Sequence, residues 1–402
     1  MPEPAFESYE QFVRDVYKEM IPLVAVGPAN GGEGELEKCR YLEQKIRELG
    51  VKEIQRVDIP DPRVKGGSRP NLLAKFGEKK ETLWIVAHMD VVPPGDGSLW
   101  SKKPFEATFG GDKVYGRGTE DDGQGILLGL VALKALIESG GEHDFSLGLA
   151  FVSDEETGSL YGAKPLSERK FFTIDDWILV PDAGNSDGSL IEVAEKGVLW
   201  LKIEVKAKQT HASTPSKGLN ACRLGSMLML EIDRTLHNKY GLRNTLFDPP
   251  ESTFEPTKRL LNVENVNTVP GSDVFYFDCR VLPDYSLDTV LSDVKEIADR
   301  FSLATGAKCL VEAASREDAS PPTDPRSPMV KALEHSLKTE RNIKAASAGI
   351  GGGTVAKYFR KSAVQTAVWM TCDQTAHQPD EYVKISNILA DAKTVFSLLK
   401  SR

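Results

Sequence analysis

Residues 84–90 read W-I-V-A-H-M-D, an apolar run that ends in a histidine and an aspartate, and the turn-rich stretch P-P-G-D-G-S-L-W follows two residues later. The run predicts a buried strand that delivers His88 and Asp90 at its end. A histidine that binds a metal usually donates its second ring N–H to a carboxylate, which fixes the orientation of the ring. The pair therefore indicates a metal site, although an ordinary strand end would also accommodate it.

The size and charge of the chain exclude several classes of protein. With 402 residues the chain exceeds the size at which one hydrophobic core stops growing, so we expect two domains. The formal net charge is −9 and no lysine- or arginine-rich block is present, so we expect no nucleic acid or membrane partner. The five cysteines are scattered without a C-x-x-C pattern, which favours reduced thiols and a cytoplasmic protein. No apolar run approaches the roughly 20 residues of a membrane span.

The first half of the chain alternates between strand and helix patterns. A helical pattern at Ile126–Ser139 lies among four short apolar segments, which are Leu72–Phe76, Leu83–Ala87, Ser146–Val152 and Trp177–Val180. This alternation predicts an α/β domain with a mixed, largely parallel sheet flanked by helices. In such domains functional groups are expected at strand ends and in the loops beyond them.

The pattern changes near Glu195. Leu201–Lys208 alternates apolar and charged residues, which is the period of a strand with one solvent-facing side. From there the order is strand, helix, strand, strand, helix, strand, with the second strand near Leu260–Val266, and it predicts an α+β four-stranded ferredoxin-like domain. The stretch Ser315–Pro328 is rich in proline and charge, like a linker, and helix and strand patterns return after it. We therefore predict a discontinuous catalytic domain, 1–194 with 316–402, and an inserted domain, 195–315.

Four further segments of the larger domain carry side chains of the types that bind metals. They are V-Y-G-R-G-T-E-D-D-G-Q-G with Asp121 and Asp122, F-V-S-D-E-E-T-G with Asp154, Glu155 and Glu156, I-L-V-P-D-A-G with Asp182, and T-A-H-Q-P-D-E-Y with His377. The acids of the first segment could instead cap the following helix, and those of the second could form a solvated turn. Phosphate binding by the glycine-rich turn is disfavoured, because the P-loop lysine is absent and the two acids would repel phosphate.

Together with H-M-D-V-V-P-P-G-D, these motifs resemble those of the two-zinc amidohydrolases that include succinyl-diaminopimelate desuccinylase, acetylornithine deacetylase, glutamate carboxypeptidase and carnosinase-like dipeptidases. The resemblance covers nearly the whole chain, including the inserted smaller domain. It implies two Zn²⁺ ions, with Co²⁺ or Mn²⁺ as substitutes, and five ligands, which are His88, Asp121, Glu156, Asp182 and His377. Asp121 would bridge both ions, Asp90 would orient His88, and Glu155 would be the general base.

The charges of this implied centre balance. Two Zn²⁺ ions and one hydroxide form a neutral centre with Asp121, Asp182 and Glu156. A further carboxylate ligand would break that balance, and catalysis needs one carboxylate that does not bind a metal ion. The implied mechanism is attack of zinc-bound hydroxide on an amide carbonyl, with Glu155 passing a proton from the water to the leaving amine.

The resemblance also assigns residues outside the metal centre. His211, in K-Q-T-H-A-S-T-P, matches a histidine that stabilises the oxyanion and that comes from the neighbouring subunit in dimeric relatives, which implies a homodimer formed through the inserted domain. Asn267 and Arg280 match positions that face substrate. An arginine fork suits a substrate carboxylate, although Arg280 could instead pair with Asp278. Within the run G-I-G-G-G-T, which resembles a substrate-side loop, the assigned residues are Gly352, Gly353 and Thr354.

We therefore expect an enzyme that hydrolyses an amide bond in a small dipeptide-like or N-acyl amino acid substrate with a free carboxylate. A dedicated N-deacylase or desuccinylase is the alternative, since Glu120, Gly123 and Gln124 depart from the residues common at that turn and leave the substrate open. A non-catalytic binding protein derived from a peptidase is a further alternative, which the presence of every ligand disfavours.

Overall fold

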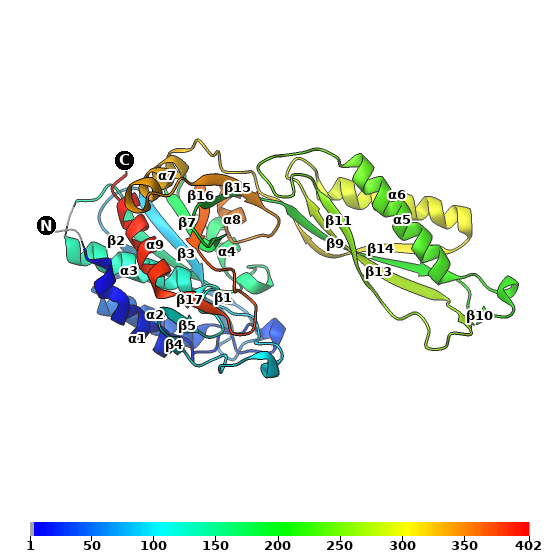
Figure 1. Ribbon diagram of the computed structural model, residues 1–402, viewed down its shortest axis with the longest axis horizontal. Helices are drawn as coiled ribbons and strands as arrows, with labels where there is room; N and C mark the ends of the chain where they lie inside the picture. Colours follow the sequence, from blue (N-terminus) through cyan, green and yellow to red (C-terminus); the bar gives the residue numbers. More distant parts are fainter. Residues whose placement is uncertain (1–3, 141, 170, 402) are drawn as a thin grey trace. The chain divides into compact units, whose positions relative to one another are not determined.

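The computed structural model describes residues 4–140, 142–169 and 171–401, and the chain forms two compact units. Unit 1 combines Met1–Val193, Thr323–Ala348 and Thr354–Arg402, and unit 2 combines Ala194–Pro322 and Gly349–Gly353. Each unit has its own sheet (Figure 1).

The sheet of unit 1 has eight strands in the order β1-β2-β6-β3-β7-β16-β8-β15. They are β1 (Glu53–Pro60), β2 (Ser68–Phe76), β3 (Thr82–His88), β6 (Ser146–Val152), β7 (Trp177–Asn185), β8 (Leu190–Glu195), β15 (Ala346–Ile350) and β16 (Gln365–Thr371). β3 runs parallel to β6 and β7, and β16 runs parallel to β7, whereas β1, β2 and β6 are joined by antiparallel pairing. The predicted mixed, largely parallel sheet is confirmed.

Helices cover both faces of this sheet. The helices of unit 1 are α1 (Glu10–Met20), α2 (Leu36–Glu48), α3 (Gly123–Ser139), α4 (Ala163–Glu168), α7 (Pro328–Arg341), α8 (Ala356–Lys361) and α9 (Ile385–Leu398). Ile85 of β3 lies beside Gly129 of α3, whereas its neighbours Trp84 and Val86 belong to a buried cluster with residues of α4 and α8. Because successive strand residues point to opposite faces, both faces of β3 must be apolar, which explains the unbroken run W-I-V-A.

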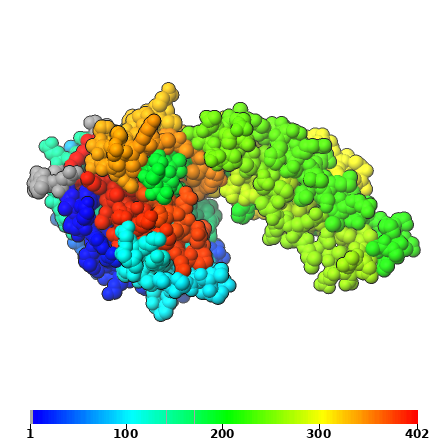
Figure 2. Space-filling view, viewed as in Figure 1, coloured from blue at the N-terminus to red at the C-terminus, as the bar shows by residue number. Residues whose placement is uncertain are grey.

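A smaller sheet completes unit 1, in the order β17-β5-β4, with strands β4 (Thr108–Gly110), β5 (Lys113–Tyr115) and β17 (Tyr382–Lys384). Residues near the two ends of the chain also contact each other. The rings of Phe6 and Phe396 lie 5.8 Å apart, and the first and last segments lie side by side in Figure 2. None of the helices in the described part of the chain combines the length and the hydrophobicity of a bilayer-spanning segment.

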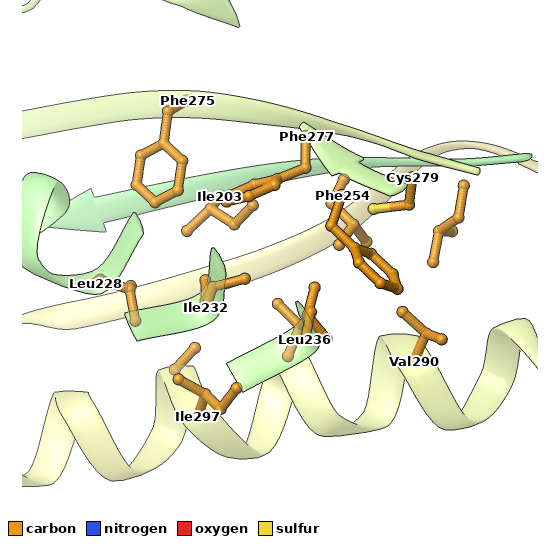
Figure 3. Packing of buried hydrophobic residues seen from close by; sticks show 14 of the residues in the cluster. Ile203, Leu228, Ile232, Leu236, Phe254, Phe275, Phe277, Cys279, Val290 and Ile297 are labelled. Atoms are coloured by element: carbon orange, nitrogen blue, oxygen red, sulfur yellow. The ribbon is translucent and has the colours of Figure 1, made fainter. Parts of the chain in front are cut away.

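Unit 2 is a four-stranded antiparallel sheet with helices packed against it. Its elements are β9 (Gly197–Lys206), β10 (Thr210–His211), α5 (Ala221–Lys239), β11 (Thr253–Arg259), β12 (Thr268–Val269), β13 (Ser272–Val281), α6 (Leu287–Thr305) and β14 (Lys308–Glu317). The sheet order is β11-β13-β9-β14, and β10 pairs separately with β12. Figure 3 shows apolar side chains of the sheet, such as Phe275 and Phe277, facing Ile232 of α5 and Ile297 of α6.

Unit 2 begins at Ala194, one residue before the predicted inserted domain, 195–315, and it differs from that domain in two further places. β14 continues to Glu317, which pairs with Val198 of β9, so the sheet carries the chain past the predicted boundary. The second difference is the short segment around Ile350. Its backbone oxygen accepts a hydrogen bond from the Lys196 N–H at 3.0 Å, which joins this late segment to unit 2.

Candidate metal centre

The predicted metal ligands of unit 1 meet at the ends of parallel strands. His88 is the last residue of β3, Glu156 follows β6, Asp182 lies near the end of β7, and His377 lies in the loop after β16. Because parallel strands end at the same edge of a sheet, these side chains are brought together. Asp121 reaches the same edge from the turn that precedes α3.

Asp121 lies between two histidines. Its Oδ1 atom is 2.7 Å from Nε2 of the buried His88, and its Oδ2 atom is 2.9 Å from Nε2 of His377. Asp182 Oδ1 lies 3.6 Å from the same His88 nitrogen, and Glu156 Oε2 lies 3.2 Å from His377 Nε2. The five residues therefore form two sets of three that share Asp121.

Asp122 completes a further group of potential ligands, with His88 and Asp182, in which the ligand atoms lie within 4.8 Å of one another. Both oxygens of Asp122 already accept hydrogen bonds from the backbone, one from the His88 N–H at 3.1 Å and one from the Gly125 N–H at 3.0 Å. Asp122 is thus the N-cap of α3. The sequence left open whether an acid of this turn caps the helix, and Asp122 is the acid that does so.

The electrostatics of the cluster favour a bound cation. Burial raises the pKa of Glu155 well above its usual range, and the charge of Asp182 raises it further. Burial alone would lower the pKa of His88, but the hydrogen bond to Asp121 raises it well above its usual value. Hydrogen bonds to Asp121 and Glu156 raise the pKa of His377 to about 10. Crowded carboxylates that draw protons onto both histidines will also attract divalent metals, and a mixed imidazole and carboxylate set suits Zn²⁺.

Asp90 has more partners than the sequence predicted. His88 Nδ1 lies 2.9 Å from the backbone oxygen of Asp90 and 3.5 Å from its carboxylate oxygen Oδ1. The carboxylate instead accepts hydrogen bonds from the backbone N–H groups of Glu155 at 3.0 Å and Glu156 at 3.1 Å. Asp90 therefore orients His88 through its backbone and fixes the turn after β6 through its side chain.

Glu155 lies half-buried at the start of a single 3₁₀ turn, Glu155–Thr157. The turn is anchored by Asp154, whose carboxylate accepts hydrogen bonds from Arg69 Nη1 and from the Tyr161 N–H, each at 3.2 Å. Among the described residues, none donates a hydrogen bond to the Glu155 carboxylate. Its oxygens therefore have no protein partner that would compete with a water molecule.

The remaining predicted site residues belong mostly to unit 2. His211, Asn267, Arg280, Gly352 and Gly353 lie in unit 2, whereas Thr354 lies in unit 1. The backbones of His211 and Asn267 are neighbours, because the Ala212 N–H donates to the Asn267 oxygen at 2.8 Å.

Arg280 binds the carboxylate of Asp278 at 2.6 and 3.0 Å, which is the pairing that the sequence left open. It also donates to the Gly351 oxygen at 3.0 Å and so ties the glycine loop to β13.

Several buried charged residues around the cluster were not predicted as site residues. Arg117 and Glu381 form an ion pair between two of the quoted motifs, and both are almost fully buried. Lys38 donates to the backbone oxygen of Met89 at 2.8 Å, between His88 and Asp90. The only sequence signal for Arg117 and Glu381 was their position inside motifs that already carried ligands, and Lys38 had none.

Comparisons with known proteins show which proteins the chain is similar to. Residues 84–401 match the sequence profile described as Peptidase family M20/M25/M40. An uncharacterized metallohydrolase of Methanocaldococcus jannaschii is 38% identical over 95% of this chain and 97% of its own length. Succinyl-diaminopimelate desuccinylase 2 of Shewanella loihica is 25% identical over 92% of this chain and 95% of its own. Human carnosine dipeptidase 1 has the same fold, with a TM-score of 0.75 at 17% identity over 99% of both chains.

Proposed function

Since the chain belongs to peptidase family M20/M25/M40, a family of metal-dependent hydrolases, we propose that it hydrolyses the amide bond of a small dipeptide-like or N-acyl amino acid substrate. The observation that carries this proposal is the position of Asp121 between His88 and His377. One carboxylate that faces a different imidazole with each oxygen is the donor arrangement of a site for two ions. The ions would be Zn²⁺, with His88, Asp121 and Asp182 holding one and His377, Asp121 and Glu156 the other.

Glu155 is the residue that we assign to proton transfer. When bound, zinc would polarise the amide carbonyl and lower the pKa of a coordinated water to about 7. The Glu155 carboxylate would take the proton of the attacking water and deliver it to the nitrogen of the leaving amine. Asp90 supports this role, because it holds the backbone of Glu155 in the turn after β6.

Unit 2 would supply the polar groups that act on the substrate. The Ser213 N–H donates to His211 Nδ1 at 3.1 Å, so Nε2 is the atom that carries the hydrogen in the neutral ring. His211 is exposed and could donate that hydrogen to an oxyanion. In the described part of the chain, Arg280 uses three of its N–H donors on Asp278 and Gly351. A guanidinium has five such donors, so two are available to a substrate carboxylate.

We also propose a homodimer through unit 2, in which His211 acts on the neighbouring subunit. The apolar side chains of Met227 and Leu230 on α5 are 53% and 64% exposed, which supports a covered surface there. A monomeric mass in solution together with full activity would contradict this arrangement. A cytoplasmic location is supported by the five cysteines, all of which are free.

Metal analysis and a substrate screen test the proposed function together. The purified, zinc-replete protein should hold two transition-metal ions per chain, and a value well under two would contradict the dinuclear centre. The screen compares dipeptides with acetyl, succinyl and carbamoyl amino acids, with and without a chelator. Chelator-sensitive hydrolysis of dipeptides supports a dipeptidase, and preferential hydrolysis of one acyl group supports the alternative, a dedicated N-deacylase. Absence of hydrolysis across the whole screen would contradict both.

A further inference from the structure

Glu120 is a buried carboxylate whose hydrogen bonds, among the described residues, all come from the loop before His377. It is 1% exposed, and it accepts backbone hydrogen bonds from Asp373 at 2.8 Å, from Ala376 at 2.9 Å and from Thr375. The Thr375 hydroxyl adds a hydrogen bond at 3.0 Å. These backbone groups lead directly into His377. The side chain of Glu120 is therefore committed to the protein backbone and is not presented to a substrate.

Glu381 binds the backbone next to Asp121, just as Glu120 binds the backbone next to His377. It is fully buried in the loop after His377, and its Oε1 atom accepts hydrogen bonds from the backbone N–H groups of Glu120 at 3.0 Å and Asp121 at 3.1 Å. Its other oxygen binds Arg117. The Glu381 backbone oxygen also accepts a hydrogen bond from the Gly116 N–H at 2.9 Å.

Each of two loops thus carries a glutamate that binds the backbone of the other. One loop presents Asp121 and the other presents His377, the two residues whose side chains lie 2.9 Å apart. We propose that Glu120 and Glu381 form a reciprocal clasp that holds Asp121 and His377 in position before any metal binds. The two glutamates are positioning residues, and the inference rests on the proposed role of Asp121 and His377 as metal ligands.

The conformation of the His377 loop explains why a clasp is needed. Gln374, His377 and Asp380 adopt the left-handed backbone region, with φ of 61°, 63° and 54°. Residues other than glycine persist in this region only when the surrounding structure holds them there. Hydrogen bonds to an ionised carboxylate are stronger than those between neutral groups, so Glu120 is suited to that task. The His377 ring is exposed, so burial does not hold it in place as it does the buried His88 ring.

Hydrogen exchange of the metal-free wild-type chain is the first test, and it requires no substitution. The amides of five residues, Glu120, Asp121, Asp373, Thr375 and Ala376, should exchange as slowly as those of β3. Exchange at the rate of unprotected loop amides would overturn the clasp. Because no metal is present, this result is independent of the proposed function.

Glu120→Gln is the second test, since it keeps the size of the side chain but places an amide NH₂ near backbone N–H donors. In the metal-free variant, the amides of Asp373 and Ala376 should exchange at least about tenfold faster, while β3 and α3 remain protected. In a zinc titration, the site of His377 and Glu156 should lose about 10–100-fold in affinity, as expected when a partner of a ligand is removed. The site of His88 and Asp182 should change by less than about threefold.

Glu106→Gln is the matched control, because Glu106 is exposed and its carboxylate pairs with Lys103 on the surface. It should leave both exchange and zinc affinity unchanged. Unchanged exchange at Asp373 and Ala376 in Glu120→Gln would overturn the clasp. Equal weakening of both zinc sites would also overturn it, because a general loss of structure would produce that result. Faster exchange in a protein that binds no zinc even as wild type would refute the proposed function and leave the clasp standing.

Discussion

The sheets of unit 1 and unit 2 place their charged residues differently. In unit 1, every residue of β3 and β6 is buried, and charged side chains collect beyond the strand ends, where many are also buried. In unit 2, buried residues alternate with accessible ones along β13, and Asp278 and Arg280 lie at accessible positions, whereas Asp273 is buried and pairs with Arg259. A buried glutamate beyond the strand ends of unit 1 therefore acts in a confined, weakly screened environment, whereas one on the open face of unit 2 is solvated.

One ion pair from each unit illustrates the difference. Arg69 in unit 1 is fully buried and binds Glu35 at 2.6 Å and Asp154 at 3.2 Å. In unit 2, Lys202 Nζ lies 3.3 Å from a Glu312 carboxylate oxygen, and their side chains are 36% and 67% exposed. Arg69 also binds Glu35 through two nitrogens, whereas Lys202 makes one contact, and only the buried residues leave an unsolvated charge when one partner is removed.

The largest effect is expected from Glu155→Gln, compared with Glu312→Gln. Loss of the proposed base should reduce kcat by about 10²–10⁴-fold, because general base catalysis contributes on that order. The same change on the open face of unit 2 should alter kcat by less than about twofold. Steady-state kinetics on the best substrate of the screen measures both, with metal content confirmed for each variant. If Glu155→Gln keeps its metal and more than a tenth of the activity, Glu155 is not the base.

Arg69→Met should have the next largest effect, on stability. Its removal leaves the buried carboxylates of Glu35 and Asp154 without their guanidinium, and loss of one partner of a buried pair costs about 3–5 kcal/mol. Urea unfolding of the metal-free protein at pH 7 measures this change. Arg69→Lys keeps the charge but loses the planar donor geometry, so its loss should be smaller. A loss below about 1 kcal/mol in Arg69→Met would show that burial does not distinguish the two ion pairs.

The strand-end positions of the proposed ligands in unit 1 could be predicted because these positions leave a local signature. An apolar run that stops at a histidine or an acid is visible along the sequence, and parallel strands bring such ends to one edge. His88, Glu156 and Asp182 are residues of this kind. The partners of Asp90 and Glu120 could not be predicted in the same way, since these side chains bind backbone N–H groups far along the chain. Every residue except proline carries such a group, so the sequence does not mark which one is the partner.

The prediction of a strand near Leu260–Val266 in unit 2 was wrong. The second strand of its sheet is β11, Thr253–Arg259, whose sequence T-F-E-P-T-K-R is charged and contains a proline. β11 is an edge strand, and its pairing shifts register between Pro256 and Lys258, where a proline is tolerated. Leu261 and Val266 are apolar but are 83% and 101% exposed. The apolar segment is therefore not a strand, whereas the charged segment before it forms the edge strand of the sheet.

A pH-dependent effect of intermediate size should come from Asp391, a fully buried acid on α9. Burial raises its pKa to about 6, although Arg341 binds it at 2.6 Å and opposes the shift. Because the folded pKa exceeds the unfolded value of 3.8, the folded protein binds more protons between these pH values. The contribution of Asp391 to stability is fully present below pH 3.8 and is lost as the pH rises through 6.

The expected loss across this window is about 3 kcal/mol at most. It is measured as the difference between wild type and Asp391→Asn in urea unfolding of the metal-free protein from pH 4 to 7. Equal pH slopes in the two proteins would show that the acid does not titrate in this window. A slope of opposite sign would mean that Arg341 outweighs burial.

The smallest effect is expected from breaking the exposed pair of unit 2. Glu312→Gln removes an ion pair that solvent and salt already screen, so unfolding free energy should change by less than about 1 kcal/mol. The change should also shrink between 0.05 and 0.5 M salt, because the Debye length falls over roughly that range. Urea unfolding of Glu312→Gln, Lys202→Met and the double variant measures the coupling between the two residues. A coupling free energy as large as the loss of unfolding free energy in Arg69→Met would mean that charge pairing, and not burial, sets the strength of an ion pair in this protein. The contrast between the two sheets would then have no energetic basis.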